Sequence, residues 1–599
     1  MIRIADYIVK YLEEYGIKHI FMISGGGAMH LNDAIGKSKK IKYICNHHEQ
    51  ACAIAAEGYA RVTNKLAVVN VTSGPGGTNT MTGVIGQWLD SVPVLYISGQ
   101  VKFETTIKSC PEIGLRQLGD QEINITDIVK PVTKYSVMLT NPDDVRAELD
   151  KAIFFATSGR PGPVWIDVPL NVQGAMIDET QLPGWLPDIP IKSVLNESLV
   201  DQTIKLIESS ERPIVIAGHG IRIANAQQQF LKLIEKLNIP VVTTFNGFDL
   251  IPSEHKNYIG RIGTLGTRPG NFALQNADLI ICIGTRNNIR QVSYSWQSYA
   301  RAAKKIIVDI DGTELNKPTI KPDIAINASA LDFINNLNSK SGLLKVNRFD
   351  EWCDWCTIRK NKYPVVLPGY KTDDKINPYF FIETLTKKMS EGSICVAGNG
   401  TACVALFQAG IVKNNQRLFW NSGCASMGYD IPAALGASVA SGKEVICLAG
   451  DGSAMMNIQE LQTIAYNKLP VKIFLLNNDG YISIKQTQHS FFGGNMVATD
   501  KNSGVGFPDF IKVAEAFGLK TEKISNSNEM DFKIDKTLSA EGSILCEVIL
   551  DQDYIFQPKL SSEKKPDGRM ISKPLEDLYP FLSREEFLSN MIVKPINED

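Results

Sequence analysis

The chain has 599 residues, of which 44% are hydrophobic, and its 62 basic and 64 acidic residues leave a formal net charge of −2. This length exceeds what one hydrophobic core supports and predicts about three domains. The near-neutral charge without a basic stripe argues against nucleic-acid binding, and the lack of an apolar run of membrane-spanning length argues against a membrane protein.

The first predicted unit, residues 1–185, alternates strand-like and helix-like stretches and ends in the proline-rich QLPGWLPDIP. It begins with MIRIADYIVKYLEEYG, which is typical of an amphipathic helix rather than a signal peptide. Buried strands such as LAVVNV indicate a parallel sheet covered by helices. Eleven scattered cysteines, mostly in apolar settings, suit reduced thiols and predict a cytoplasmic protein.

The second unit, residues 190–340, begins near ERPIVIAGHG and ends near KKIIVDIDGTELNKP, with the same strand–turn–helix order. A polar stretch is expected to link it to a third unit, residues 365–560, and a tail follows at 561–599. In the link, Cys353 and Cys356 form a lone CxxC. A zinc site would need a second pair of ligands, so we interpret this spacing as coincidental rather than as a metal or redox site. The loops Gly218-His219-Gly220 and Gly398-Asn399-Gly400 follow strands but do not complete GxGxxG, so a hydride-transferring dehydrogenase is a weak alternative.

The third unit contains the most informative segment, in which ICLAGDG and VKIFLLNN flank the helix-like ELQTIAYNK. A strand–helix–strand unit places both strand ends at the carboxyl edge of one parallel sheet. Asp451 and Asn478 are therefore expected to lie close together. Their oxygens are ligands that Mg²⁺ prefers, with phosphate oxygens and water completing the octahedron.

Several motifs together resemble those of the acetolactate synthase (acetohydroxyacid synthase large subunit) family of thiamine-diphosphate (ThDP) enzymes. They are the Gly-Asp-Gly and Asn-Asn pair, HHEQACAIAAEGYAR, the GPGGTN loop, SGQ, SGRPGPVWIDVPLNVQ and NSGCASMGYDIPAALGA. The resemblance covers roughly residues 1–560. It implies an α/β fold with three doubly wound parallel-sheet domains, which are pyrimidine-binding, central and diphosphate-binding, and a C-terminal tail.

The resemblance also implies roles for single residues. Glu49 takes the place of the glutamate that hydrogen-bonds the aminopyrimidine, although an acid at that point also suits the first turn of a helix. Met427 takes the place of the side chain that bends the cofactor, and the Ala425 carbonyl that of the acceptor for the 4′-amino group. Ala425 replaces the usual glycine, which should be tolerated unless the backbone needs a positive φ. The implied catalytic residues are Glu49, Gln121 and Met427; the cofactor-binding residues are Gly74, Gly398, Asn399, Gly400, Thr401, Ala425, Met427, Gly450, Asp451, Gly452, Ser453, Asn478, Gly480, Tyr481 and Ile482; the metal ligands are Asp451, Asn478 and Gly480.

A second cofactor is implied for the central domain. LGTRPGNFALQNADLIICIGTRNNIRQVSY is similar to the segment with which acetolactate synthases hold FAD, where Arg286 matches the first arginine and Arg290 the second. Asp309, in DIDGTE, matches the adenosine-side strand end. The alternative is a central domain that keeps its fold without flavin.

Departures from the family concern the substrates. Thr487 stands where a tryptophan usually narrows the acceptor pocket, and Asp120 replaces a phenylalanine, which favours a bulkier or more polar acceptor. His30 and His47 replace a proline and an arginine; each is open to a proton-transfer role or to a structural one. Arg290 points the other way, because it matches the arginine that grips the carboxylate of a 2-oxo acid acceptor. The candidate substrate residues are Gly26, His30, Asp120, Arg290 and Thr487.

The sequence therefore predicts a ThDP- and Mg²⁺-dependent carboligase. It would decarboxylate a 2-oxo acid, pyruvate by expectation, and transfer an acetaldehyde-type unit to a carbonyl acceptor, either pyruvate, giving 2-acetolactate, or a bulkier one such as a keto-sugar. The alternatives are a non-ligating decarboxylase or another ThDP lyase and, in a different class, a non-catalytic partner subunit. The resemblance also implies a homodimer or homotetramer in which Glu49 and Asp451 of each site come from different chains.

Overall fold

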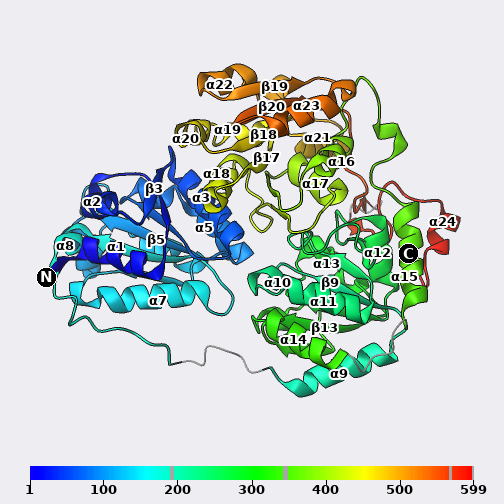
Figure 1. Ribbon diagram of the computed structural model, residues 1–599, viewed down its shortest axis with the longest axis horizontal. Helices are drawn as coiled ribbons and strands as arrows, with labels where there is room; N and C mark the ends of the chain where they lie inside the picture. The colour runs from blue at the N-terminus through cyan, green and yellow to red at the C-terminus, as the bar shows by residue number, and fades with distance from the viewer. Residues whose placement is uncertain (189–194, 342–347, 565–568, 597–599) are drawn as a thin grey trace.

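The computed structural model describes residues 1–188, 195–341, 348–564 and 569–596. It contains three six-stranded sheets, each entirely parallel. Helices cover both faces of each sheet (Figure 1). The predicted α/β class with three doubly wound parallel-sheet domains is confirmed, and the three sheets lie within the three predicted units.

The first domain has the strand order β3-β2-β4-β5-β7-β6. Its strands are β2 (His19–Met22), β3 (Lys42–Cys45), β4 (Ala67–Val71), β5 (Val94–Gln100), β6 (Tyr135–Met138) and β7 (Val164–Pro169), and the short β1 (Ile2–Arg3) and β8 (Met176–Ile177) pair antiparallel beside it. Its helices are α1 (Ile4–Tyr15), α2 (Met29–Lys37), α3 (Glu49–Thr63), α4 (Pro75–Thr78), α5 (Met81–Asp90), α6 (Ile125–Val129), α7 (Val145–Thr157) and α8 (Leu170–Gly174). The predicted N-terminal amphipathic helix is α1, whose apolar face is buried.

The third domain repeats this topology in the order β16-β15-β17-β18-β20-β19. Its strands are β15 (Ile394–Ala397), β16 (Arg417–Phe419), β17 (Val445–Gly450), β18 (Val471–Asn477), β19 (Lys520–Ile524) and β20 (Ile544–Ile549). Its helices are α16 (Pro378–Lys388), α17 (Thr401–Ala409), α18 (Asp430–Ser441), α19 (Asp451–Met455), α20 (Glu460–Tyr466), α21 (Ile482–Phe492), α22 (Phe510–Ala516) and α23 (Ser527–Ser539). Helices α3 and α18 are topologically equivalent, because each joins the second strand of its sheet to the third.

The central domain has a different order, β11-β10-β9-β12-β13-β14, so the chain reverses direction across its sheet between β9 and β12. Its strands are β9 (Pro213–Ala217), β10 (Val241–Thr243), β11 (Tyr258–Arg261), β12 (Leu279–Ile283), β13 (Lys304–Asp309) and β14 (Ile324–Asn327). Its helices are α9 (Glu197–Ser209), α10 (Gly220–Ile223), α11 (Gln227–Leu237), α12 (Arg268–Asn276), α13 (Ile289–Val292) and α14 (Ala330–Lys340). Ligands of such sheets bind outside the carboxyl ends of the strands at the reversal.

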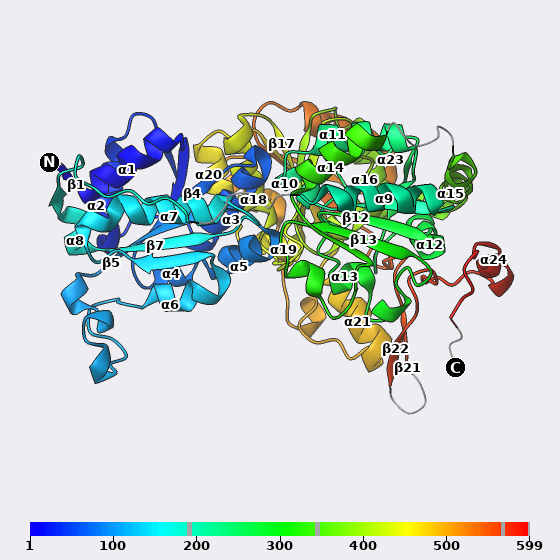
Figure 2. The ribbon, with the colours of Figure 1, turned by 90° about the horizontal axis from the view of Figure 1, so that it is seen from below.

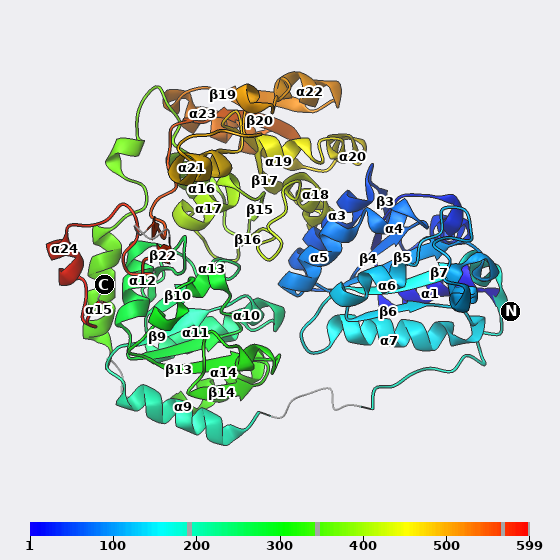
Figure 3. The ribbon, with the colours of Figure 1, turned by 180° about the vertical axis from the view of Figure 1, so that it is seen from behind.

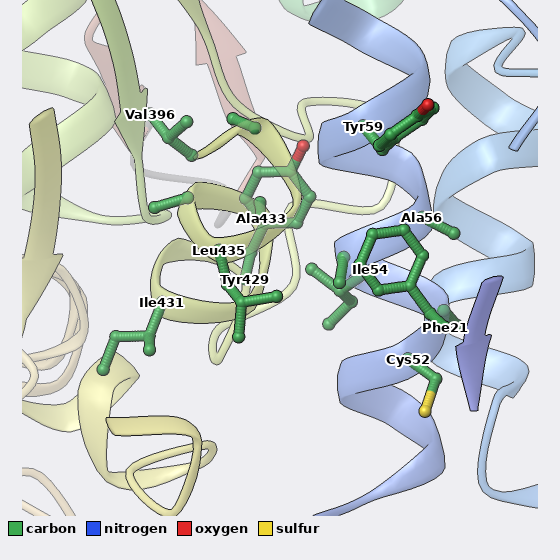
Figure 4. Packing of buried hydrophobic residues seen from close by; sticks show 14 of the residues in the cluster. Phe21, Cys52, Ile54, Ala56, Tyr59, Val396, Tyr429, Ile431, Ala433 and Leu435 are labelled. Atoms are coloured by element: carbon green, nitrogen blue, oxygen red, sulfur yellow. The ribbon is translucent and has the colours of Figure 1, made fainter. Parts of the chain in front are cut away.

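The first and third domains share a hydrophobic core, in which α3 crosses α18 (Figure 4). Glycines allow the close approach: a Cβ on Gly58 would lie 2.2 Å from the Ala433 carbonyl oxygen, and one on Gly436 would lie 1.8 Å from that of Ala55. Seen from below, the first domain lies beside the other two, which overlap each other (Figure 2).

The predicted polar link differs from a simple connection, because part of it forms α15 (Asp350–Lys362). Trp352 and Cys356 of this helix are buried in the core of the central domain. Cys353 donates to the Asn238 carbonyl at 3.3 Å, and no group of three or more potential metal ligands occurs within the described ranges. The CxxC spacing thus reflects helix packing here.

The tail contains the hairpin β21 (Ser562–Lys564) and β22 (Met570–Ser572) and the helix α24 (Arg584–Ser589). It returns to the central domain, where Asn271 donates to the Leu575 carbonyl at 2.9 Å and Arg301 forms a 2.8 Å ion pair with Glu576. Viewed from behind, α24 lies beside α15 (Figure 3). Of the helices in the described residues, none is both long and apolar enough to cross a membrane.

Candidate active site

Asp451 and Asn478 lie together at the carboxyl edge of the third sheet. They follow β17 and β18, which pair in parallel with Gly450 opposite Leu476. One oxygen of Asp451, Oδ2, accepts hydrogen bonds from the backbone N–H groups of Asn478 and Gly480, both at 3.1 Å. The structure therefore brings the three predicted metal ligands into one cluster.

The donor set of this cluster suits Mg²⁺. Asn478 Oδ1 is buried and accepts no hydrogen bond from the described residues. A buried oxygen without a donor is costly unless a ligand satisfies it. Asp451 is 3% exposed, and burial raises its pKa to about 6. A bound dication would oppose this effect, because its positive charge stabilises the ionised carboxylate. A carboxylate, an amide oxygen and a main-chain carbonyl are hard ligands of the kind that Mg²⁺ takes.

The predicted diphosphate loop lies at the next strand of the sheet. Gly398 follows β15, and a Cβ there would lie 2.1 Å from Asp430 Oδ2, so a side chain at this position would displace the buried Asp430 carboxylate. Gly400 has a φ of 100° and precedes Thr401, the first residue of α17. The Asn399 side chain donates to the Ser426 carbonyl at 2.8 Å. The loop is thereby joined to the segment that contains Met427.

Around Asp451 the other predicted residues pack closely. A Cβ on Gly452 would lie 2.1 Å from the Tyr481 ring, and Ser453 Oγ accepts from the Gly428 N–H at 2.8 Å. Gly450 ends β17, and the buried Ile482 begins α21. The bond between Ser453 and Gly428 joins the metal-ligand cluster to the Met427 segment.

The segment around Met427 is held by the Asn421 side chain. Asn421 Oδ1 accepts from the N–H groups of Cys424 at 3.1 Å and Ala425 at 3.2 Å. Ala425 has a φ of 54°, so the positive φ that would favour glycine is present. Met427 is partly exposed.

On the first domain, Glu49 is the first residue of α3, and its carboxylate accepts from Asn79 Nδ2 at 2.9 Å. The neighbouring Gln50 accepts from Asn457 Nδ2 at 2.9 Å, and the same amide donates to the Gly428 carbonyl at 2.7 Å. The start of α3 is therefore tied to the Met427 segment within one chain.

Gly74 and Gln121 also lie together. Gly74 has a φ of 61°, and a Cβ there would lie 2.5 Å from the Gln121 carbonyl oxygen. Glu122 is buried and accepts from the N–H groups of Leu118 at 2.9 Å and Gly119 at 3.1 Å, which fixes the loop. Asp120 stays exposed on this loop.

The remaining substrate candidates are more scattered. Gly26 is exposed in the turn before α2, and Thr487 is exposed on α21, where it donates to the Ser483 carbonyl at 3.0 Å. His30 Nδ1 lies 3.4 Å from a guanidinium nitrogen of Arg3. His47 is exposed, and its backbone N–H donates to Glu460 at 2.9 Å.

A cavity of about 210 Å³ lies where the three domains meet, beyond the carboxyl ends of β9, β10, β12 and β13. Arg286, Arg290 and Asp309, the residues matched to a flavin segment, all line it. The Arg290 guanidinium lies 5.0 Å from the centroid of the Phe245 ring, and burial raises the pKa of Asp309 to about 6. Its place at the sheet reversal and its arginines suit a dinucleotide with a pyrophosphate.

The sequence did not predict a buried ion-pair network of Arg61, Glu57 and Asp90 beside the cavity. Arg61 pairs with Glu57 at 2.9 Å and with Asp90 at 2.7 Å. Asp90 also accepts from the backbone N–H groups of Ser422 at 3.0 Å and Gly423 at 3.1 Å. The only sequence signal was the presence of charged residues within otherwise apolar helices.

Comparisons with known proteins agree with this geometry. The chain matches the family models for the thiamine pyrophosphate enzyme N-terminal TPP binding domain over residues 2–124, the central domain over 200–337 and the C-terminal TPP binding domain over 398–548. It is 34% identical over 576 residues to the acetolactate synthase large subunit of Corynebacterium glutamicum, covering 93% of this chain and 88% of that one.

Two further relatives are similarly close. Chloroplastic acetolactate synthase 2 of Nicotiana tabacum is 32% identical over 573 residues, covering 93% of this chain and 83% of that one. The acetolactate synthase isozyme 1 large subunit of Escherichia coli is 31% identical over 555 residues, covering 92% and 95%. The chain therefore belongs to the thiamine pyrophosphate enzyme family and is a ThDP-dependent enzyme of the acetolactate synthase type.

Proposed function

We propose that this enzyme is a Mg²⁺-dependent carboligase that decarboxylates pyruvate and transfers the resulting two-carbon unit to a carbonyl acceptor. The supporting observation is the cluster of Asp451, Asn478 and Gly480, with an unsatisfied buried amide oxygen, beside the segment of Met427. The names of the relatives support pyruvate as donor, and as acceptor when 2-acetolactate is formed.

Each residue has a physical role in this proposal. Asp451, Asn478 and the Gly480 carbonyl would hold Mg²⁺, and the ion would bind the diphosphate. ThDP would supply the electron sink that makes decarboxylation possible. Glu49, which Asn79 hydrogen-bonds, would hold a proton at the aminopyrimidine, and the Ala425 carbonyl would accept from the 4′-amino group. Met427 would pack against the cofactor, and Gln121 lies beside Gly74 of the first domain.

The cavity between the domains supports FAD as a second, structural cofactor. Arg286 lies 3.8 Å from Asp90 in its wall, and Asp309 ends β13, where an acid suits a ribose hydroxyl. Absorbance of the purified protein near 450 nm, with release of flavin on denaturation, tests this assignment. Colourless protein that takes up no added FAD would contradict it.

Two substituted residues bear on the identity of the acceptor substrate. Thr487 and Asp120 are both exposed, and neither presents a large apolar wall, which favours a bulkier or more polar acceptor such as a keto-sugar. The E. coli and tobacco relatives are named for acetolactate, which favours pyruvate. A non-ligating decarboxylase is the remaining chemical alternative.

Product analysis separates these possibilities. The enzyme is incubated with pyruvate, ThDP and Mg²⁺, with and without aldehydes, ketones and keto-sugars, and products are identified by mass spectrometry. Acetolactate or an acetaldehyde-unit adduct of an added acceptor is expected. Free acetaldehyde alone would support a decarboxylase, and no consumption of any 2-oxo acid would contradict the proposal.

A variant of Glu49 tests its proposed role in proton transfer at the cofactor. Glu49→Gln keeps a hydrogen bond to the pyrimidine but cannot support the tautomer change, so ThDP should bind while exchange of its C2 proton slows by two orders of magnitude or more. NMR in deuterated water measures that exchange. Wild-type exchange in the variant would remove Glu49 from its role.

A further inference from the structure

The Asn478 amide is held by two hydroxyl groups that act in series. Its Nδ2 donates to Thr401 Oγ1 at 3.3 Å. The Thr401 and Tyr554 hydroxyls are hydrogen-bonded to each other. The amide nitrogen thus has a hydroxyl partner, whereas Oδ1 accepts no hydrogen bond from the described residues.

These groups converge from separate parts of the third domain. Thr401 begins α17, Asn478 follows β18, and Tyr554 lies in the segment after β20. All three are buried, with exposures of 6%, 3% and 5%. Their contacts are therefore shielded from competing water.

Helix α21 fixes the position of Tyr554. Gln486 on this helix donates to the Tyr554 carbonyl at 2.9 Å and accepts from the Phe556 N–H at 3.3 Å. The two bonds hold the backbone on the C-terminal side of Tyr554. The same helix begins at Ile482, two residues after Gly480, so Gln486 joins this backbone to the loop of the proposed metal ligands.

The Thr401 hydroxyl favours one orientation of the amide when a cation is bound. As observed, Nδ2 donates to Thr401 Oγ1, and Oδ1 is left for a ligand. If the amide turned over, its N–H groups would lose the Thr401 acceptor in a buried place and would face the proposed cation, which an N–H group cannot bind. The observed orientation is therefore the one in which both ends of the amide have partners once Mg²⁺ is present.

We propose that Thr401 and Tyr554 are positioning residues that fix the Asn478 amide with its oxygen free to bind Mg²⁺. The inference rests on the proposed role of Asn478 as a metal ligand. Partners of this kind orient a ligand without touching the metal, and their loss costs about 10–100-fold in metal affinity. The metal dependence of ThDP binding should therefore change, rather than ThDP binding as such.

The test uses Tyr554→Phe and Thr401→Val, which remove one hydroxyl each. At fixed ThDP, Mg²⁺ is titrated and binding is followed by tryptophan fluorescence and calorimetry. The half-saturating Mg²⁺ concentration should rise about 10–100-fold in both variants. In Tyr554→Phe, which changes a residue outside the diphosphate loop, ThDP affinity at saturating Mg²⁺ should stay near the wild-type value. Thr401→Ser keeps the hydroxyl and should restore the wild-type midpoint.

A matched control comes from the same region. Tyr379 is fully buried, and its hydroxyl donates to Gln408 at 2.8 Å and accepts from the Gln557 N–H at 3.1 Å. Tyr379→Phe therefore removes a buried hydroxyl next to the same segment without touching Asn478, and its Mg²⁺ midpoint should not move. An equal shift in this control would attribute the effect to packing and overturn the proposal.

Two other results would also overturn it. Unchanged Mg²⁺ midpoints in folded Tyr554→Phe and Thr401→Val proteins would show that the hydroxyls do not position the ligand, with the proposed function intact. ThDP binding by the wild-type protein that needs no divalent cation would remove the metal role itself. Because Tyr554 lies outside the diphosphate loop, Tyr554→Phe alone decides the question if Thr401→Val fails to fold.

Discussion

Ala425 carries the backbone strain of the cofactor segment. Its φ of 54° lies in the left-handed region, which costs a non-glycine residue roughly 1–2 kcal/mol. Glycine removes this cost, but it destabilises the folded protein by about 0.5–1 kcal/mol because it loses more conformational entropy on folding. Ala425→Gly should therefore stabilise the protein by about 0.5–1 kcal/mol, seen as a higher Tm.

The control for Ala425→Gly is Ala440→Gly in α18, which replaces a helical alanine and should destabilise by about 1 kcal/mol. The Ala425 carbonyl is a main-chain group, so ThDP affinity should survive the Ala425→Gly change. A lower Tm in Ala425→Gly would mean that the alanine methyl contributes packing that outweighs the strain.

Asp430 makes stability depend on pH. Its Oδ2 accepts no hydrogen bond from the described residues, and burial raises its pKa from 3.8 to about 6. Because the folded state holds the proton more tightly, this contribution is complete below pH 4 and is lost as pH rises to 6. The loss is at most about 3 kcal/mol.

Asp430→Asn should remove this dependence. Its Tm should exceed that of the wild type at pH 7.5 and approach it at pH 4.5, as measured by calorimetry across the range. The exposed Asp354→Asn serves as the control and should leave the pH profile unchanged. Parallel profiles for wild type and Asp430→Asn would show that Asp430 does not titrate in this window.

The reach of sequence reasoning differs among these residues. Asp451 and Asn478 could be placed together because each directly follows an apolar strand, and adjacent parallel strands end at one edge. Tyr554 could not, because it is separated from Thr401 by 153 positions and meets it only through the fold. The positive φ of Ala425 could not be predicted either, because alanine rarely adopts that conformation and the sequence gives no sign of it.

Among the elements, the crossing of α3 and α18 has the tightest geometry. A Cβ on Gly436 would lie 1.8 Å from the Ala55 carbonyl oxygen, and backbone cannot move aside as a flexible side chain can. Gly436→Ala should therefore separate the helices and destabilise by about 1–3 kcal/mol or more. Since α3 begins at Glu49 and α18 follows Met427, ThDP affinity should fall as well.

A glycine in open space provides the comparison. Gly36 lies inside α2, where a Cβ would meet nothing within 4 Å, so Gly36→Ala should stabilise by about 0.4–1 kcal/mol. Thermal unfolding of both variants, with cofactor titrations, measures the two effects. A Gly436→Ala protein as stable as the wild type would show that the helices can separate at no cost.

Helices differed in how well their sequence predicted them. Helix α1 was predictable because its apolar residues recur at helical spacing and lie on one buried face. Helix α15 was expected to be a polar link, because charged residues surround it and only Trp352 and Cys356 are fully buried. Its packing depends on the central domain, which its own pattern does not reveal.

At the scale of the molecule, the buried Arg417 joins the three domains through one ion pair and one hydrogen bond. Arg417 of the third domain pairs with Asp249 of the central domain at 2.8 Å and donates to the Arg61 carbonyl of the first at 3.1 Å. Asp90 lines the cavity while it holds Ser422 and Gly423. Asp90 therefore joins the cavity wall to the segment that leads to Ala425 and Met427.

The assembly of the chains determines which of them complete each active site. Family resemblance implies a homodimer or homotetramer whose sites take Glu49 from one chain and Asp451 from another. Within one chain, Gln50 already lies beside Gly428 through Asn457, so a site completed by a single chain is the competing arrangement. The two arrangements differ in whether defective chains can rescue each other.

Mixing inactive Glu49→Gln and Asp451→Ala chains under conditions of subunit exchange should restore activity if sites are shared. A mixed dimer then carries both defects in one site and neither in the other. Random mixing makes half of the dimers mixed, so about a quarter of all sites should be intact. Each variant alone, carried through the same exchange, is the control. Verified mixed dimers without activity, or an active species that sediments as a monomer, would place Glu49 and Asp451 of each site on one chain.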